Sequence, residues 1–196
     1  MAKLIGLTGG IGSGKTTIAS YFKSLGIPLY IADDEAKAIL YTPQAVEEVK
    51  KVFTEDVFTD GLPDRAKLAA VVFSDPDKLK VLNGIIHPKV AKHFTAWKKQ
   101  YENEKFIMRE AAILFESGSY KDCDSVILVT APVEIRIQRV MQRDKVTREK
   151  VLERMNNQWS DEKKAALSNY IITNIKLEEA KEQAVEILKI LNKIEN

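Results

Sequence analysis

Residues 9–16, with the sequence GGIGSGKT, constrain this chain most, because they match the pattern G-x-x-x-x-G-K-[ST] in full. An apolar run, Leu4 to Thr8, precedes the motif, and a helical pattern, Thr16 to Leu25, continues from it. Glycines let the backbone curve with positive φ, so that successive N–H groups converge on one anion at the positive end of the helix. The sequence therefore predicts a strand, a phosphate loop and a helix that together bind a nucleoside triphosphate.

The residue types at the end of the motif suit that chemistry. Lys15 can reach the β- and γ-phosphates as a mobile positive charge, and the Thr16 hydroxyl can act as a ligand to Mg²⁺. Thr17 can donate a hydrogen bond to the α-phosphate. An incidental glycine-rich turn would not explain both the complete motif and its flanks. We expect ATP and Mg²⁺ as cofactors, and the nucleotide on Gly12, Ser13, Gly14, Lys15, Thr16 and Thr17.

Five short apolar runs rich in β-branched residues are typical of strands, and helical patterns separate them. Several runs are continuously apolar, as expected for strands that are covered on both faces. The alternation predicts an α/β chain with a three-layer αβα P-loop NTPase fold and a five-stranded parallel sheet. The expected strands are Leu4 to Thr8, Ile27 to Ile31, Phe106 to Glu110, Ser125 to Thr130 and Tyr170 to Thr173.

Two segments are additions to this sheet. The chain between the second and third strands is far longer than a crossover requires, and its helical patterns predict a helical insert over residues 35–103 that shapes a second binding site. Residues 136–158, rich in Arg, Gln and Lys, follow a helix-start signal at Ala131-Pro132 and predict a protruding helical lid. The core of this single domain is then residues 1–34, 104–135 and 159–196.

Composition narrows the classes of partner. The chain has 30 Lys and Arg against 28 Asp and Glu, and a net charge of +2 does not indicate a nucleic-acid footprint. No window approaches the roughly 18 apolar residues of a membrane span, and the N-terminal apolar stretch is too short for a secretory signal. A single cysteine, Cys123, cannot form an internal disulfide or a zinc site. We therefore expect a cytoplasmic protein.

Phosphoryl transfer also needs a group that orients or deprotonates the acceptor, and cations that stabilise the transferred charge. Asp33 follows the second strand at the edge where parallel sheets bind ligands, but it also suits the N-cap of a helix that begins near Glu35. Arg136, Arg139 and Arg143 share one helical face, which either closes on a triphosphate or faces solvent.

Other classes of triphosphate-binding protein fit less well. A GTPase switch needs the segments D-x-x-G and N-K-x-D, and the sequence contains neither in full. A nucleic-acid motor usually needs more chain and a more basic surface. The remaining candidates are a kinase of a small molecule and, as a different class, a regulatory ATP-binding module without transfer chemistry.

Separated blocks of the chain resemble the dephospho-CoA kinase family over essentially its whole length. Residues 7–15, LTGGIGSGK, have that family's form of the loop. Ala32-Asp33 ends its D-A-D segment, although Ile31 replaces the first Asp. Asp64-Arg65 and residues 82–88, LNGIIHP, are similar to its acceptor-binding helical region.

The second half of the chain continues the resemblance. Residues 110–116, EAAILFE, are similar to D-x-P-L-L-F-E, with Glu110 for Asp and Ala112 for Pro. Residues 139–143, RVMQR, together with Arg154 and Gln158, resemble the lid, and residues 168–174, SNYIITN, resemble A-D-x-x-I-x-N.

The resemblance implies that ATP phosphorylates the ribose 3′-hydroxyl of dephospho-CoA, giving coenzyme A and ADP in the last step of coenzyme A biosynthesis. It makes Asp33 the expected catalytic base, Lys15 and Arg139 the stabilisers of transferred charge, and Arg143 a nucleotide ligand. It also places Glu110 with Thr16 around Mg²⁺. The implied acceptor-binding residues are Asp33, Arg65, His87, Leu114, Phe115 and Glu116.

Taken singly, several of these residues have ordinary structural explanations. Leu114 and Phe115 would be core residues, Arg65 would be an exposed helix cation, and His87 would start the long helix before a proline. Only their joint order and spacing makes them site candidates. A kinase of nucleosides or nucleotides remains the rival within the same class. We expect a monomer or small homo-oligomer whose partners are small molecules, not nucleic acid or membrane.

Overall fold

The computed structural model describes residues 1–194, apart from the side chains of Phe73 and Ile194. The last two residues of the predicted core, 195 and 196, lie outside the described residues. The chain forms two compact units. We call Ala32–Gln100 the insert unit, and the described residues before and after it the core unit.

The core unit is built on a parallel sheet in the order β2-β5-β1-β6-β7, which confirms the predicted fold class. The second strand starts two residues later than predicted, because the Ile27 N–H still donates to the Phe22 carbonyl of the preceding helix. Its strands are β1 (Lys3–Thr8), β2 (Leu29–Ile31), β5 (Phe106–Glu110), β6 (Ser125–Thr130) and β7 (Tyr170–Thr173).

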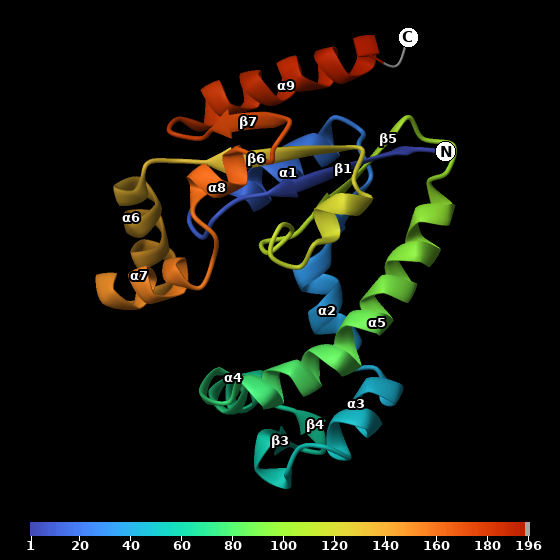
Figure 1. Cartoon of the computed structure of the whole chain (residues 1–196), viewed down its shortest axis with the longest axis vertical. Helices are drawn as coiled ribbons and strands as arrows, with labels where there is room; N and C mark the ends of the chain where they lie inside the picture. The colour runs from blue at the N-terminus through green and yellow to red at the C-terminus, as the bar shows by residue number, and fades with distance from the viewer. Residues whose placement is uncertain (195–196) are drawn as a thin grey trace. The chain divides into compact units, whose positions relative to one another are not determined.

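Helices α1 (Lys15–Ser24) and α9 (Leu177–Ile194) cover one face of this sheet. Ile5 and Leu7 of β1 are buried in one cluster with Phe22 of α1 and Ala184 of α9. Figure 1 shows α9 running alongside β7. This packing accounts for the amphipathic pattern of the C-terminal helix, since its apolar stripe meets the sheet.

The opposite face of the sheet is covered by the segment after β5, which includes the 3₁₀ helix η2 (Ser119–Asp122), and by α8 (Asp161–Ala165). Gly6 of β1 leaves room for this layer, because a Cβ there would lie 2.7 Å from the Leu114 side chain and 2.9 Å from the Cys123 sulfur. The strands are therefore covered on both faces, as their continuously apolar sequences predicted.

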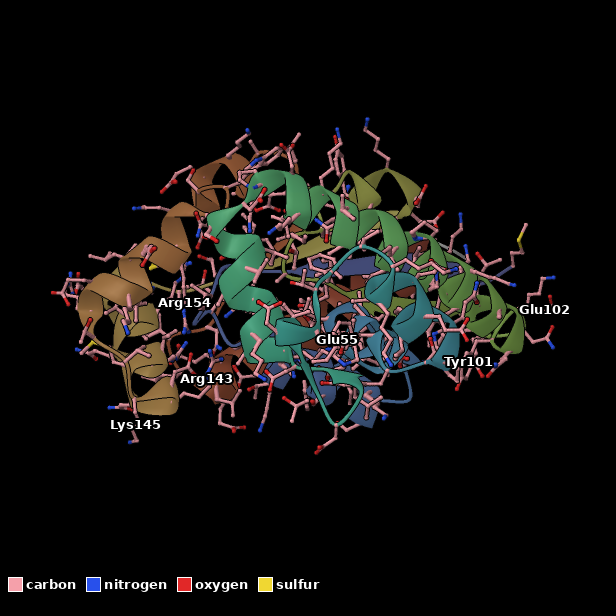
Figure 2. All side chains as sticks on the ribbon, turned by 90° about the horizontal axis from the view of Figure 1, so that it is seen from below. Glu55, Tyr101, Glu102, Arg143, Lys145 and Arg154 are labelled. Atoms are coloured by element: carbon pink, nitrogen blue, oxygen red, sulfur yellow. The ribbon has the colours of Figure 1, made fainter. Side chains whose placement is uncertain are left out.

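The predicted lid segment forms two helices, α6 (Val133–Asp144) and α7 (Arg148–Asn156). Lys145 ends α6 in the left-handed conformation, with φ of 54°. Ile137 and Val140 of α6 pack with Val151 of α7 in a small buried cluster. The start of α6 is therefore part of the packed core unit, whereas its far end carries exposed charged residues (Figure 2).

The insert unit is largely helical, as its sequence patterns indicated, and also contains a short hairpin that the sequence did not predict. The longest helix, α5, contains Pro88 and changes direction along its length (Figure 1), because proline removes one helical hydrogen bond. The elements of the insert unit are α2 (Ala32–Leu40), α3 (Pro43–Lys50), η1 (Glu55–Val57), β3 (Phe58–Thr59), β4 (Leu62–Pro63), α4 (Arg65–Ser74) and α5 (Pro76–Gln100). Across the described residues, no helix has the length and apolar content that a membrane span needs.

Asp64 caps α4 in the insert unit and gives a first test of the structure. Its Oδ1 accepts hydrogen bonds from the backbone N–H groups of Lys67 (3.1 Å) and Ala66 (2.9 Å). We expect Asp64→Ala to lower the melting temperature at neutral pH by roughly 2–4 °C, because these helix N–H groups lose their acceptor. Thermal unfolding followed by circular dichroism measures the change.

Asp64→Asn is the matched control, since asparagine also caps helices. The Lys67 N–H bond holds the pKa of the Asp64 carboxyl below its ordinary value. Such a group stabilises the fold fully above its unfolded pKa, and the contribution is lost as the pH falls through the folded pKa. The difference between wild type and Asp64→Ala should therefore shrink in acid. A pH-independent difference would show that the carboxylate is not the cap.

Candidate active site

The loop between β1 and α1 presents backbone donors to an anion. Gly12 and Gly14 have φ values of 80° and 84°, which place both residues in the left-handed region. Gly14 is the N-cap of α1 and supplies no side-chain hydrogen bond to the helix. The first N–H groups of α1 thus have no side-chain cap, and with the helix dipole they form an anion site.

Asn174, directly after β7, holds the loop from the core side. It is 4% exposed, and its Nδ2 donates a hydrogen bond of 2.8 Å to the Ser13 carbonyl. The backbone N–H of Asn174 donates to the Thr130 carbonyl at 2.7 Å, which holds Asn174 at the end of β6. A Cβ at Gly14 would overlap the Asn174 amide, so glycine is required there by contact as well as by φ.

Two predicted site residues meet beside the loop. Lys15 forms an ion pair with Glu110, the last residue of β5, whose side chain is only 1% exposed. Glu110 reaches this place because it pairs with Leu7 of β1, just before the loop begins. The carboxylate predicted for the Mg²⁺ shell therefore lies against the lysine predicted for the phosphates.

Arg139 of α6 also lies at the loop. Its Nη2 donates to the Ile175 carbonyl at 3.1 Å. Its Nη1 is buried without a hydrogen-bond partner among the described residues, and lies 4.0 Å from where a Cβ of Gly14 would be. Because a buried unsatisfied donor is costly, this nitrogen is suited to donate a hydrogen bond to a ligand oxygen.

The other two arginines of the predicted shared face are engaged elsewhere. Arg143 is exposed and bonds Asp144 through Nε (2.7 Å) and Nη2 (3.1 Å), which raises the pKa of the Arg143 guanidinium. Arg154 of α7 bonds the same carboxylate at 2.7 Å, and Figure 2 labels both arginines. Arg136 is buried and faces the loop backbone instead of solvent. The predicted face therefore divides into three different environments.

The residues after β5 are packed in the core unit. Leu114 and Phe115 are buried, and Phe115 stacks on Trp159 with ring centroids 6.5 Å apart. Glu116 Oε1 accepts a hydrogen bond from the backbone N–H of Trp159 at 2.9 Å and pairs with Lys164 at 3.1 Å, where the lysine side chain is fully buried. For Leu114 and Phe115, this arrangement favours the core-packing alternative that the sequence left open.

The remaining predicted site residues belong to the insert unit. Asp33 is half-buried in the first turn of α2, which begins at Ala32, so Asp33 is not the N-cap of a helix starting near Glu35. Arg65 is exposed at the start of α4. His87 is exposed in the middle of α5, so it does not start that helix.

Sequence reasoning did not assign roles to the side chains that support the loop. Asn174 and Gln158 stood in family-like blocks, but their spacing carried no signal of contact with residues far away in the chain. Asp161 and Lys164 lie in the charged stretch DEKK, residues 161–164, which nothing in the sequence marks as buried. Only a polar residue predicted at a buried position could have revealed them.

The oxygen donors beside the loop suit Mg²⁺. Within the described part of the chain, no three His, Cys, Asp or Glu side chains gather as a metal cluster. Mg²⁺ in phosphate sites keeps several waters and uses one or two protein oxygens besides substrate phosphates. The Thr16 hydroxyl, exposed in the first turn of α1, and the Glu110 carboxylate meet that requirement.

Comparisons with known proteins agree with this geometry. The family model described as dephospho-CoA kinase matches residues 3–179. A dephospho-CoA kinase of Bacteroides fragilis is 37% identical over 175 residues, covering 89% of this chain and 85% of that protein. The crystal structure of TT1252 from Thermus thermophilus matches with a TM-score of 0.90 at 35% identity, covering 96% of this chain and 97% of that one. The dephospho-CoA kinase from Campylobacter jejuni has a TM-score of 0.74 at 27% identity, with 100% of both chains covered. The chain therefore belongs to the dephospho-CoA kinase family.

Proposed function

We propose that this protein transfers the γ-phosphate of ATP to the ribose 3′-hydroxyl of dephospho-CoA and so completes coenzyme A synthesis. The observation that carries the proposal is the phosphate loop with Lys15 and Arg139 beside it, in a chain of this family. Transfer of a phosphoryl group depends on positioning and on cations around its equatorial oxygens, and these residues supply both.

On the nucleotide side, the backbone from Gly12 to Thr17 would bind the phosphates. Lys15 would leave Glu110 to contact the γ-phosphate, and the unpartnered Nη1 of Arg139 would donate to an oxygen of the transferred group. Arg143 would join them when its end of the lid approaches the nucleotide.

Mg²⁺, when bound, would neutralise charge on the β- and γ-phosphate oxygens. Thr16 would hold the ion through its hydroxyl, and Glu110 would stand in its shell. Once Lys15 turns to the phosphates, the buried Glu110 carboxylate needs a new positive partner, because an isolated buried charge is costly. The metal would therefore replace the lysine at this carboxylate.

On the acceptor side, Asp33 would take the proton of the 3′-hydroxyl. It stands two residues beyond β2, whose last residue, Ile31, pairs with Glu110 in the sheet. Arg65 and His87 of the insert unit would bind the anionic groups of dephospho-CoA. In the core unit, Glu116 would also bind the acceptor, and the buried Leu114 and Phe115 would hold this segment in place.

We also propose that the protein is cytoplasmic and is a monomer or a small homo-oligomer.

An acceptor panel tests the function. Purified protein with ATP and Mg²⁺ would receive dephospho-CoA, adenosine or AMP at equal concentration, while ADP and coenzyme A are followed by chromatography. We expect ADP formation with dephospho-CoA only, in step with coenzyme A. Turnover with adenosine or AMP would support a kinase activity but reject dephospho-CoA as the specific acceptor. ADP formation with no acceptor dependence would reject the kinase.

The proposed base is tested by Asp33→Ala. We expect turnover to fall by roughly 10²-fold or more while ADP affinity stays within about twofold, because general-base catalysis is lost and the phosphate loop is untouched. Asp34→Ala is the matched control, since Asp34 is the neighbouring exposed carboxylate and pairs within its own helix, with Lys37 at 2.6 Å. Near-normal turnover of Asp33→Ala would remove Asp33 from the mechanism.

The proposed metal shell is tested by Glu110→Gln. We expect the Mg²⁺ concentration for half-maximal turnover to rise roughly 10-fold or more, because the shell loses its carboxylate charge. ADP affinity without Mg²⁺ should not fall, because Lys15 then no longer has a competing carboxylate. An unchanged Mg²⁺ requirement would place Glu110 outside the shell.

A further inference from the structure

Ile11, near the apex of the phosphate loop, has both of its backbone polar groups bound by distant side chains. Its N–H donates to Gln158 Oε1 at 2.9 Å, and its carbonyl accepts from Arg136 Nε at 2.9 Å. Arg136 lies near the start of α6, and Gln158 lies just after the end of α7. The two ends of the lid segment therefore hold one residue of the loop between them.

The glycines on either side of Ile11 allow this contact. A Cβ at Gly10 would overlap the Arg136 guanidinium, and a Cβ at Gly12 would overlap the Arg136 carbonyl. Arg136 thus touches three consecutive loop residues with its side chain and its backbone. The glycine pattern at these positions serves the approach of α6 as well as the curvature of the loop.

Arg136 is itself fixed in place. It is 5% exposed, and its Nη1 pairs with Asp161 Oδ2 at 2.8 Å. The same carboxylate oxygen accepts the Thr130 hydroxyl at the end of β6. Turning Arg136 toward a phosphate would leave the Asp161 charge unpaired in a poorly solvated position, which costs far more than moving an exposed arginine. Arg136 is therefore not a mobile charge for the transition state.

We infer that Arg136 and Gln158 are positioning residues, which form a clasp that fixes the phosphate loop through the backbone of Ile11. Because Gln158 binds the Ile11 N–H, and the Gly10 carbonyl accepts the Ser13 N–H at 3.0 Å, the donors left for a phosphate lie at Gly12 and from Gly14 onward. The clasp preorganises these donors, so less of the binding energy is used in ordering the loop. This inference rests on the proposed function only in assuming that the loop binds the nucleotide.

The test measures ADP affinity by calorimetry, and KM and kcat for each substrate, in three variants. We expect Gln158→Ala to weaken ADP binding roughly 10-fold and to leave KM for dephospho-CoA unchanged, because only the loop loses a hydrogen bond. Arg136→Lys should weaken ADP binding to a similar extent, because lysine keeps the positive charge but lacks the planar fork that binds Ile11 and Asp161 at once. The double variant should lose well under 100-fold in ADP affinity, because both residues act through Ile11 and their effects should not add fully.

Arg148→Ala is the matched control, an exposed lid arginine paired with Glu134 at 2.7 Å, and it should bind ADP as wild type does. Wild-type ADP affinity in Arg136→Lys, or fully additive losses in the double variant, would overturn the clasp. A lower kcat and melting temperature with unchanged ADP affinity would also overturn it, because that is the result of general destabilisation. If Arg136→Lys does not fold, Gln158→Ala decides alone.

These outcomes separate the clasp from the proposed function. Weaker ADP binding in the variants supports the clasp even if wild type fails to phosphorylate dephospho-CoA in the acceptor panel. Unchanged ADP binding rejects the clasp even if wild type makes coenzyme A at full rate.

Discussion

A loop that binds phosphate through its backbone cannot satisfy those same N–H groups within its own secondary structure, and this constraint organises the core unit. The donors must point outward to the ligand, so the loop has to be held by its remaining backbone groups. Asn174 binds the Ser13 carbonyl, and Arg136 and Gln158 bind the two sides of Ile11. Each support comes from a segment more than a hundred residues away in the chain, so tertiary contacts hold the loop in addition to its local bond from the Ser13 N–H to the Gly10 carbonyl.

Several charges near the loop, although not Arg139, are buried in pairs with carboxylates. Three pairs join a cation with little or no exposure to a carboxylate on another element: Lys15 with Glu110, Arg136 with Asp161, and Lys164 with Glu116. Burying such pairs gains little stability, because desolvation offsets most of the Coulomb attraction. These pairs instead position the segments that carry them, since each pair holds one end of a segment at the carboxyl edge of the sheet. A net charge of +2 gives no sign of this arrangement.

Sequence reasoning succeeded where local chemistry decides the structure. The five strands were predictable because continuous β-branched runs have few other stable states, and the phosphate loop because its glycines and lysine have fixed spacing. It was less successful where a choice depends on tertiary contact. The spacing of Arg136, Arg139 and Arg143 correctly indicated one helix, yet spacing alone cannot tell which residue of a stripe is turned inward. The helix that was predicted to begin near Glu35 begins at Ala32 instead, because α2 continues directly from β2 without a separate cap.

The different environments of the lid arginines divide the lid into a fixed base and a part that can move at low cost. At the base, moving Arg136 would break a buried pair and release Ile11. At the far end, Arg143 can leave Asp144 without leaving that carboxylate unpaired, because Arg154 stays bound to it and the Asp144 side chain is partly exposed. Exposed pairs of this kind contribute little to stability, so exchanging one for a phosphate oxygen costs little free energy. A closing motion that carries Arg143 to the nucleotide should therefore bend the lid beyond the clasp, leaving the base of α6 against the loop.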